Sequence, residues 1–298
     1  MRRFLIGALL LLAACGQKAA VGVKVDPALG ALVPPDTVLL AGTRVEALLK
    51  TVVYQKYFAQ RSFPQMEKFA QQTGLDLRKD LSELLFVSNG HQGVLLGRGK
   101  FANEMEPKLE KQGAQRFVYK GHNLIGNDRA AVMFVNSSTA AVGETAALES
   151  LIDHRQESNG PPALLAAQMK EIPAEVQFWA AYAGGSIQLP FPENSNLANV
   201  NKLLSSVQSG TVYFDLRTGL NGVATGVCSS EQGAQDVQGA LKALVGLGRL
   251  STPADRPELL SAYDSIRITQ DSRRVKVYID VPQELADKFL EVWIGRQR

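Results

Sequence analysis

"SIRITQDSRRVKVYIDV", residues 265–281, carries the pattern from which the fold class of this chain can be predicted. Apolar and polar residues alternate without exception in its second part, where the apolar ones are Val275, Val277, Ile279 and Val281. A period of two is typical of a β-strand that buries one face. The run 265–269 precedes it, and polar Asp271 and Ser272 separate the two. The stretch therefore predicts an antiparallel hairpin with one face against a core.

The patterns around this hairpin extend the prediction to the whole second half of the chain. Its other predicted strands are 176–182, 211–216 and 222–228, and its predicted helices are 197–207 and 232–247. Pro282, a residue favoured in the first turn of a helix, starts a closing helix. The apolar residues on one face of that helix are Leu285, Phe289, Leu290 and Trp293. We expect an antiparallel sheet packed against these helices.

The first half shows nearly the same order of patterns. Its predicted strands are 38–41, 84–87, 94–96, 117–119, 123–125, 131–135 and 139–142. Its predicted helices are 45–60, 64–72, 102–112 and 144–154. Pro64 is expected to open the second of these helices and Gly74 to end it, while Asn89-Gly90 is a hairpin signal. The common order indicates an internal duplication, although identities between the halves are few.

The predicted fold class is therefore α+β, with two similar halves that are each a mainly antiparallel sheet packed against helices. We expect the first half at residues 37–157 and the second at 175–298, with a connector at 158–174. The stretch SNGPP, residues 158–162, marks the joint because Gly and Pro interrupt both helix and strand.

Two stretches resemble a known group of proteins. TGLDLRKDLSELL at residues 73–85 and SIRITQDSRRVKVYIDVPQEL at 265–285 are similar to segments of uncharacterised bacterial envelope proteins, grouped as domains of unknown function with α+β repeats. The resemblance covers about a third of the chain, and its motifs are a helix stop, a buried strand and a hairpin. It implies a fold and an envelope location, and it identifies no functional residue.

The N-terminus predicts a lipid anchor. FLIGALLLLAAC, residues 4–15, follows Met1-Arg2-Arg3 and is long enough for a secretory signal but too short to span a bilayer. Its last residues, Leu12-Ala13-Ala14-Cys15, resemble a bacterial lipobox. The resemblance implies removal of residues 1–14 by cleavage between Ala14 and Cys15, and attachment of a diacylglycerol and acyl chains such as palmitate to Cys15. The alternative is an ordinary signal peptide with a chance cysteine.

The residues after the anchor bear on location. Residues 15–36 lack a sustained period and carry Gly and Pro at intervals, so we expect the lipidated cysteine and a flexible tether there. Gly16-Gln17 follows the cysteine in place of the Asp that commonly retains such lipoproteins at the inner membrane. The resemblance therefore favours the outer membrane, facing the periplasm, if the organism has two membranes.

Charge and cysteine content exclude some classes of function. The net charge of +3 falls to +1 when Arg2 and Arg3 are removed, and the chain has no long basic block. We therefore expect no nucleic-acid partner. Cys228 is then the only cysteine besides the anchor. Because it sits in an apolar strand pattern, we predict a small buried hydrophobic residue rather than a nucleophile.

No motif for catalysis, cofactor or metal stands out. Gly97, Gly99 and Ala102 fit the dinucleotide pattern G-x-G-x-x-A, but the preceding strand is predicted in an antiparallel hairpin, whereas the pattern requires a parallel β-α-β unit. None of the three histidines, which are His91, His122 and His154, has neighbours at a spacing typical of a metal site. We therefore expect no cofactor and no metal.

The function predicted from these patterns is a membrane-anchored envelope lipoprotein that binds or scaffolds a protein, glycan or lipid partner without catalysis. Phe191, between Pro190 and Pro192, fits neither a helix nor a central strand, so it is expected to fill the edge of the core, with a possible partner contact as the alternative. The alternative function is a carrier that shelters a lipid or other apolar molecule between sheet and helices. An enzyme of unidentified class is the third hypothesis.

Overall fold

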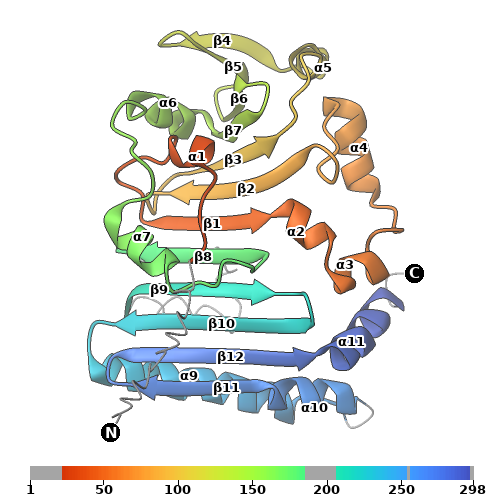
Figure 1. Cartoon of the computed structure of the whole chain (residues 1–298), viewed down its shortest axis with the longest axis vertical. Coiled ribbons are helices and arrows are strands. Elements are labelled where there is room, and N and C mark those ends of the chain that lie inside the picture. The colour runs from red at the N-terminus through yellow and green to blue at the C-terminus, as the bar shows by residue number, and fades with distance from the viewer. Residues whose placement is uncertain (1–21, 185–205, 254–255, 296–298) are drawn as a thin grey trace, which may run out of the picture.

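The computed structural model describes residues 22–184, 206–253 and 256–295. Its strands are β1 (Leu39–Arg44), β2 (Leu81–Ser88), β3 (Gly93–Gly99), β4 (Gln115–Tyr119), β5 (His122–Gly126), β6 (Ala130–Asn136), β7 (Thr139–Glu144), β8 (Phe178–Ala183), β9 (Val207–Asp215), β10 (Gly219–Cys228), β11 (Ile266–Asp271) and β12 (Arg274–Pro282). All of them join one antiparallel sheet that runs the length of the molecule (Figure 1).

Helices cover parts of both faces of this sheet, which confirms the predicted α+β class. They are α1 (Pro27–Gly30), α2 (Val45–Leu49), α3 (Val52–Tyr57), α4 (Pro64–Thr73), α5 (Met105–Lys111), α6 (Thr145–Asp153), α7 (Ala163–Met169), α9 (Glu231–Leu250), α10 (Pro257–Asp264) and α11 (Gln283–Gly295). Among the described residues, no helix is both long enough and apolar enough to cross a membrane.

The strand order is β11-β12-β10-β9-β8-β1-β2-β3-β7-β6-β5-β4. The predicted halves therefore meet at neighbouring strands, because β1 pairs with β8 in antiparallel register. Each half contains a hairpin, a helix and a further hairpin whose last strand returns to the first hairpin: β7 pairs with β3, and β12 pairs with β10. This shared connectivity is compatible with a duplication, which stays a prediction.

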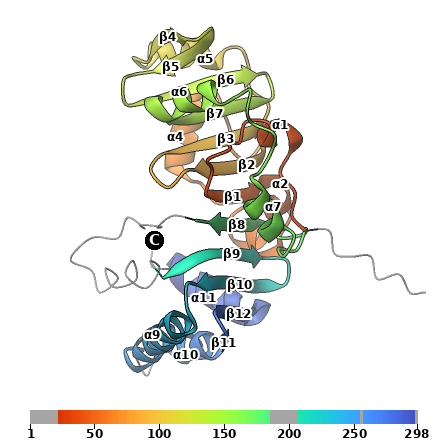
Figure 2. The same cartoon turned by 90° about the vertical axis from the view of Figure 1, so that its left-hand side faces the viewer.

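The main core of the first half and the core under α9 in the second half lie on opposite faces of the sheet. We call face A the one that carries Leu40, Leu85 and Ala181, which are fully buried under α1, α6 and α7. Face B is the other one. In the second half, α9 packs on face B against Cys228 and Val275. Figure 2 shows the result, with α1 and α7 on one side of the sheet and α9 on the other.

The hairpins form as predicted. β2 and β3 pair around Asn89-Gly90, where Gly90 has a positive φ, and β11 and β12 pair around Ser272, which also has a positive φ. Gly74 adopts the left-handed conformation that ends α4, also as predicted. The helix predicted at 197–207 lies outside the described residues.

The tether predicted at residues 15–36 is wrong for residues 22–36. Gly22 forms a bridge with Pro173, and the Val23 amide donates to the Ile172 carbonyl at 3.0 Å. Leu29 and Val33 are fully buried. Pro27 is not a linker residue but stands in the first turn of α1. The segment packs along the core although its apolar residues follow no regular period. Residues 15–21 lie outside the described part.

Two other segments also differ from the prediction. The helix expected at 45–60 is two short helices, because the Thr51 side chain accepts from the Tyr54 amide at 3.2 Å and so caps α3. The predicted connector 158–174 contains α7, whose Leu165 is fully buried. Both segments carry apolar residues that only the tertiary packing assigns to the core.

The contact between Gly42 and Trp179 at the β1–β8 pairing generates the first prediction. The two residues are opposite each other, and a Cβ added to Gly42 would overlap the Trp179 ring. Because Trp179 is buried, Gly42→Ala is expected to destabilise the fold by about 1–3 kcal/mol in urea unfolding. Gly239→Ala is the control, since nothing lies within 4 Å of that helical position. It is expected to stabilise by about 0.5–1 kcal/mol, and equal stability of the two variants would contradict the role of Gly42.

Candidate ligand pocket

The residues predicted to mark the anchor and the partner contact, Ala14, Cys15 and Phe191, lie outside the described residues. Their roles therefore stay predictions. The remaining candidates of the sequence lie in the described part and can be placed.

The G-x-G-x-x-A pattern lies at the end of β3 and serves packing. β3 is antiparallel to both of its neighbours, β2 and β7, so the parallel unit that a dinucleotide site requires is not formed by these strands. A Cβ on Gly99 would overlap the carbonyl of Asp80. Glycine therefore permits two backbone segments to approach closely here.

The histidines and the cysteine do not assemble into a site. His154 caps the C-terminus of α6, and its Nδ1 lies 2.8 Å from the Ser150 carbonyl. Cys228 is fully buried, as predicted, and burial raises the pKa of its thiol. Within the described ranges, no group of three His, Cys, Asp or Glu side chains could hold a metal ion.

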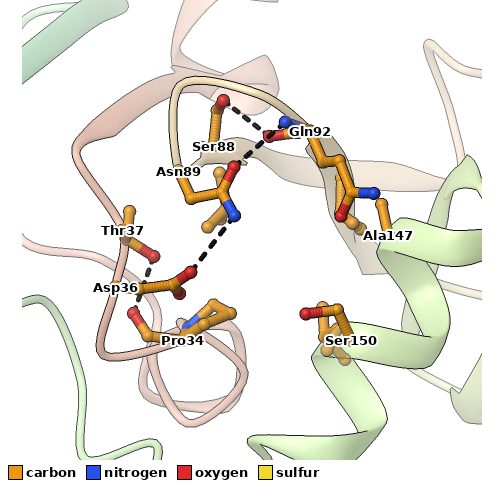
Figure 3. A pocket seen from close by; sticks show the side chains of 12 residues that line it. Pro34, Asp36, Thr37, Ser88, Asn89, Gln92, Ala147 and Ser150 are labelled. Atoms are coloured by element: carbon orange, nitrogen blue, oxygen red, sulfur yellow. Dashed lines mark hydrogen bonds between the residues drawn. The ribbon is translucent and has the colours of Figure 1, made fainter. Parts of the chain in front are cut away.

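A small polar pocket lies beside the β2–β3 turn (Figure 3). Asn89 donates through Nδ2 to Asp36 at 3.1 Å and accepts from the Gln92 amide at 3.0 Å, while the Ser88 hydroxyl donates to the Gln92 carbonyl at 2.6 Å. The volume is about 30 Å³, which is room for about one water molecule. These polar groups bond to one another and stabilise the turn.

A larger pocket lies on face B of the second half, under α10 and α11. Its volume is about 490 Å³. The sheet contributes Leu220, Ile266, Ile279 and Val281; α10 contributes Leu259, Ala262 and Tyr263; α11 contributes Ala286, Phe289 and Leu290; and Val53 and Leu216 complete the lining. Tyr263 is the only one of these residues whose side chain has a polar atom. We call this space the α10–α11 pocket.

The packing of α10 and α11 explains why the space exists. α9 packs closely on α10, because Gly248 leaves room for the Tyr263 ring and Arg249 forms an ion pair with Asp264. α9 covers Cys228 and Val275 of the sheet, so α10 stands beside it over Ile266. α10 and α11 contact each other, but together they do not fill the space above β10, β12 and β11.

A contact between the two halves lies next to the α10–α11 pocket, to whose lining α3 contributes Val53. Lys56 on α3 donates to Asp287 on α11 at 2.6 Å, and the Tyr57 hydroxyl lies 3.4 Å from Glu291. We call these two contacts the α3–α11 clasp. The hydrogen bond to Asp287 raises the pKa of Lys56. Partial burial would raise the pKa of Asp287, but hydrogen bonds from Lys56 and Gln283 outweigh it and hold that pKa below the usual 3.8.

The sequence patterns missed this pocket because they missed α10. A signal for that helix exists, since Pro257 stands in its first turn and Leu259, Ala262 and Tyr263 follow at helical spacing. What no pattern reveals is that these residues face a space and not a filled core.

The comparisons with known proteins show the fold. No family model and no curated protein matches the sequence. Crystal form III of TP0453, a Treponema lipoprotein of unknown function, has a TM-score of 0.53 and 10% sequence identity, and the match covers 90% of this chain and 99% of that one. Crystal form I of the same protein gives a TM-score of 0.49 at 11% identity, with 90% and 98% covered. At such identity, the likeness extends to the fold and not to individual residues.

The α3–α11 clasp is predicted to depend on pH. Because the pKa of Asp287 is lowered in the folded protein, the clasp contributes fully above pH 3.8 and is lost as the pH falls through that lowered pKa. Hydrogen exchange of the α11 amides, corrected for intrinsic rates, should rise across that interval. Asp287→Asn should speed exchange already at neutral pH and remove the pH dependence.

Lys120→Met is the matched control for this measurement. Lys120 pairs with Asp153 at 2.7 Å, far from the α10–α11 pocket in the strand order. Lys120→Met should leave the hydrogen exchange of the α11 amides unchanged. If Asp287→Asn also leaves α11 unchanged, the clasp does not hold this helix.

Proposed function

We propose that this protein is a lipid-anchored, non-enzymatic binding protein of the bacterial envelope, and that the α10–α11 pocket holds an apolar ligand. The observation that carries the proposal is the chemistry of that pocket: eleven of its twelve lining residues have purely hydrocarbon side chains. Its volume of about 490 Å³ lies within the range of about 300–1,000 Å³ typical of small-molecule sites.

The physical basis of binding is removal of apolar surface from water. Each Å² of apolar surface that a ligand buries contributes about 25 cal/mol, and the exposed lining of the pocket is almost entirely apolar. A charged ligand group would lose its water here without gaining a charged partner, since Tyr263 supplies the only polar side-chain atom of the lining. The pocket therefore favours an aliphatic or aromatic molecule with at most one hydrogen-bonding group.

Anchoring at the membrane is the second part of the proposal and rests on Cys15. The lipobox-like Leu12-Ala13-Ala14-Cys15 supports it, and the fold neighbour TP0453 is itself a lipoprotein. Gly16-Gln17 favours the outer membrane, facing the periplasm, if the organism has two. A protein fixed at a bilayer has ready access to apolar molecules, so the anchor and the pocket support the same class of ligand.

Scaffolding of a partner is the second candidate function, and a separate observation favours it. Face B carries an apolar groove of about 310 Å³ across the β8–β1–β2 region, lined by residues that include Phe178, Ala180 and Val212. Phe86 lies in the same groove and is 37% exposed. Val142, on β7, is 44% exposed. Ala286→Phe fills the α10–α11 pocket. If that variant keeps full cellular function while Phe86→Ser loses it, the role is scaffolding and not ligand transport.

Filling the pocket tests ligand binding. Ala286 lines the pocket and is 7% exposed, so Ala286→Phe places a ring in the space where the ligand would lie. Native mass spectrometry of protein extracted from its own membrane should show bound ligand on the wild type and none on the variant. Binding of an apolar fluorescent probe should weaken at least about tenfold, which is 1.4 kcal/mol.

Ala243→Phe is the matched control, because Ala243 is an exposed residue of α9 that does not line the pocket. It should bind the ligand and the probe as the wild type does. Circular dichroism and urea unfolding show whether Ala286→Phe is folded. A folded wild type that carries no ligand and does not bind the probe would contradict the proposal.

Replacing the anchor cysteine tests attachment to the membrane. Cys15→Ala removes the acceptor thiol, so label from a fatty-acid analogue should be present on the wild type and absent from the variant. Signal cleavage that requires the modified cysteine should also fail, while urea unfolding of the folded part should stay unchanged. Wild-type protein recovered from the membrane without label would exclude lipidation.

A further inference from the structure

We infer that the anchored protein lies on the bilayer with the surface around α7, and that this surface contacts anionic lipid headgroups. We call it the α7 surface and define it by Lys24, Leu164, Lys170 and the turn 158–161. The inference rests on the lipidation of Cys15 in the proposed function and goes beyond it, because it assigns which face of the fold meets the membrane.

The first step is the length of chain between the anchor and the fold. Because residues from Gly22 onward are packed, only the six residues 16–21 separate Cys15 from the described part. Seven consecutive Cα–Cα steps span at most about 25 Å, and a flexible chain of that length has a root-mean-square span of about 15 Å. The anchor therefore holds Gly22 close to the headgroups.

The second step is the position of Gly22, which is fixed against the C-terminal end of α7. It bridges to Pro173, and a Cβ on Gly22 would overlap the backbone of Met169 and Lys170. The next residue, Val23, is 5% exposed and its amide bonds to Ile172 at 3.0 Å. The chain thus enters the fold at a rigid point on the side of the sheet where α7 packs.

The third step compares the α7 surface with the most apolar exposed helix. Leu247 and Leu250 of α9 are 61% and 85% exposed and could also contact lipid. α9 lies on face B, however, whereas α7 lies on face A (Figure 2). To bring α9 to the bilayer, the tether would have to extend past the α7 layer, the sheet and the α9 layer. These three layers are together about 30 Å thick, at about 10 Å a layer. This exceeds the full length of the tether, so α9 points away from the bilayer.

The chemistry of the α7 surface fits a headgroup layer. Leu164 is 72% exposed, and Lys24 and Lys170 are exposed beside an open hollow of about 660 Å³ that also borders Gly22. Neither lysine forms an ion pair with another described residue. Of the nearby acids, Glu171 is engaged by Arg274 at 3.3 Å and Glu157 is exposed. Basic residues near a membrane surface contribute about 1 kcal/mol each toward anionic lipids.

The test measures the depth of single probes on the lipidated full chain. Leu164→Cys and Leu247→Cys are similarly exposed leucines on opposite faces, and each is labelled with a fluorophore; the native Cys228 is fully buried and does not react. The protein is placed in phosphatidylcholine–phosphatidylglycerol vesicles that contain headgroup spin-labelled lipid. We expect quenching at position 164 to exceed that at position 247 severalfold.

Two further variants separate the effect of tether length from the effect of the two lysines. A flexible insertion of about 20 residues after Gln17 should reduce the difference between the two probes, because the longer tether no longer restricts the orientation. Lys24→Glu combined with Lys170→Glu should reduce quenching at 164 in anionic vesicles and change it little in neutral ones.

The outcomes are distinct. Equal quenching at the two positions, or stronger quenching at 247, overturns the orientation while the anchor stands. Mass spectrometry of the same sample reports the anchor: protein without lipid on Cys15 overturns the anchoring part of the proposed function, and this inference with it.

Discussion

The antiparallel pairing of β1 with β8 is the interaction on which the rest of the structure depends. It joins two groups of strands that are far apart in sequence, and it places Gly42 opposite Trp179. A side chain at position 42 would occupy the space of the indole ring. Because residue 42 has no side chain, the Trp179 ring packs into the main core, where only 3% of its surface is exposed. The pairing therefore converts two half-sheets into one continuous sheet with a shared core on face A.

A continuous sheet whose main cores lie on different faces in its two halves has consequences for function. On face A, the core under α1, α6 and α7 contains many fully buried residues, and these come from both the beginning and the end of the first half. On face B of the second half, α9 occupies the position nearest Cys228 and Val275, so α10 and α11 must cover the remaining strands alone. They leave the apolar α10–α11 pocket. α3, from the first half, contributes Val53 to the lining and pairs with α11 through Lys56 and Asp287, so the pocket belongs to both halves.

The packing of residues 22–36 bears on the membrane attachment that we propose. A segment without a period looks like a linker in the sequence, yet Leu29 and Val33 are fully buried and Gly22 is fixed against α7. If Cys15 is the anchor, as we propose, only the six residues 16–21 separate it from the packed part of the chain, and their full length is less than the thickness of the fold. A long tether would leave the orientation free, whereas a short one makes the entry point of the chain decide which surface meets lipid.

The sequence by itself determined the local elements. Strict alternation at Val275–Val281 required a strand with one buried face, Asn89-Gly90 required a tight turn, and Gly74 required a left-handed helix end. These features depend on neighbours a few residues apart, so patterns of period 2 and 3.6 suffice. The burial of Cys228 also followed from its apolar strand. Only the tertiary structure decided that β1 pairs with β8, that α9 and α7 lie on opposite faces, and that α10 and α11 leave a space. The β1–β8 pairing joins residues more than a hundred positions apart, and the other outcomes depend on packing between elements that are not neighbours in sequence. A period along the chain contains no information on which of these faces fills which volume.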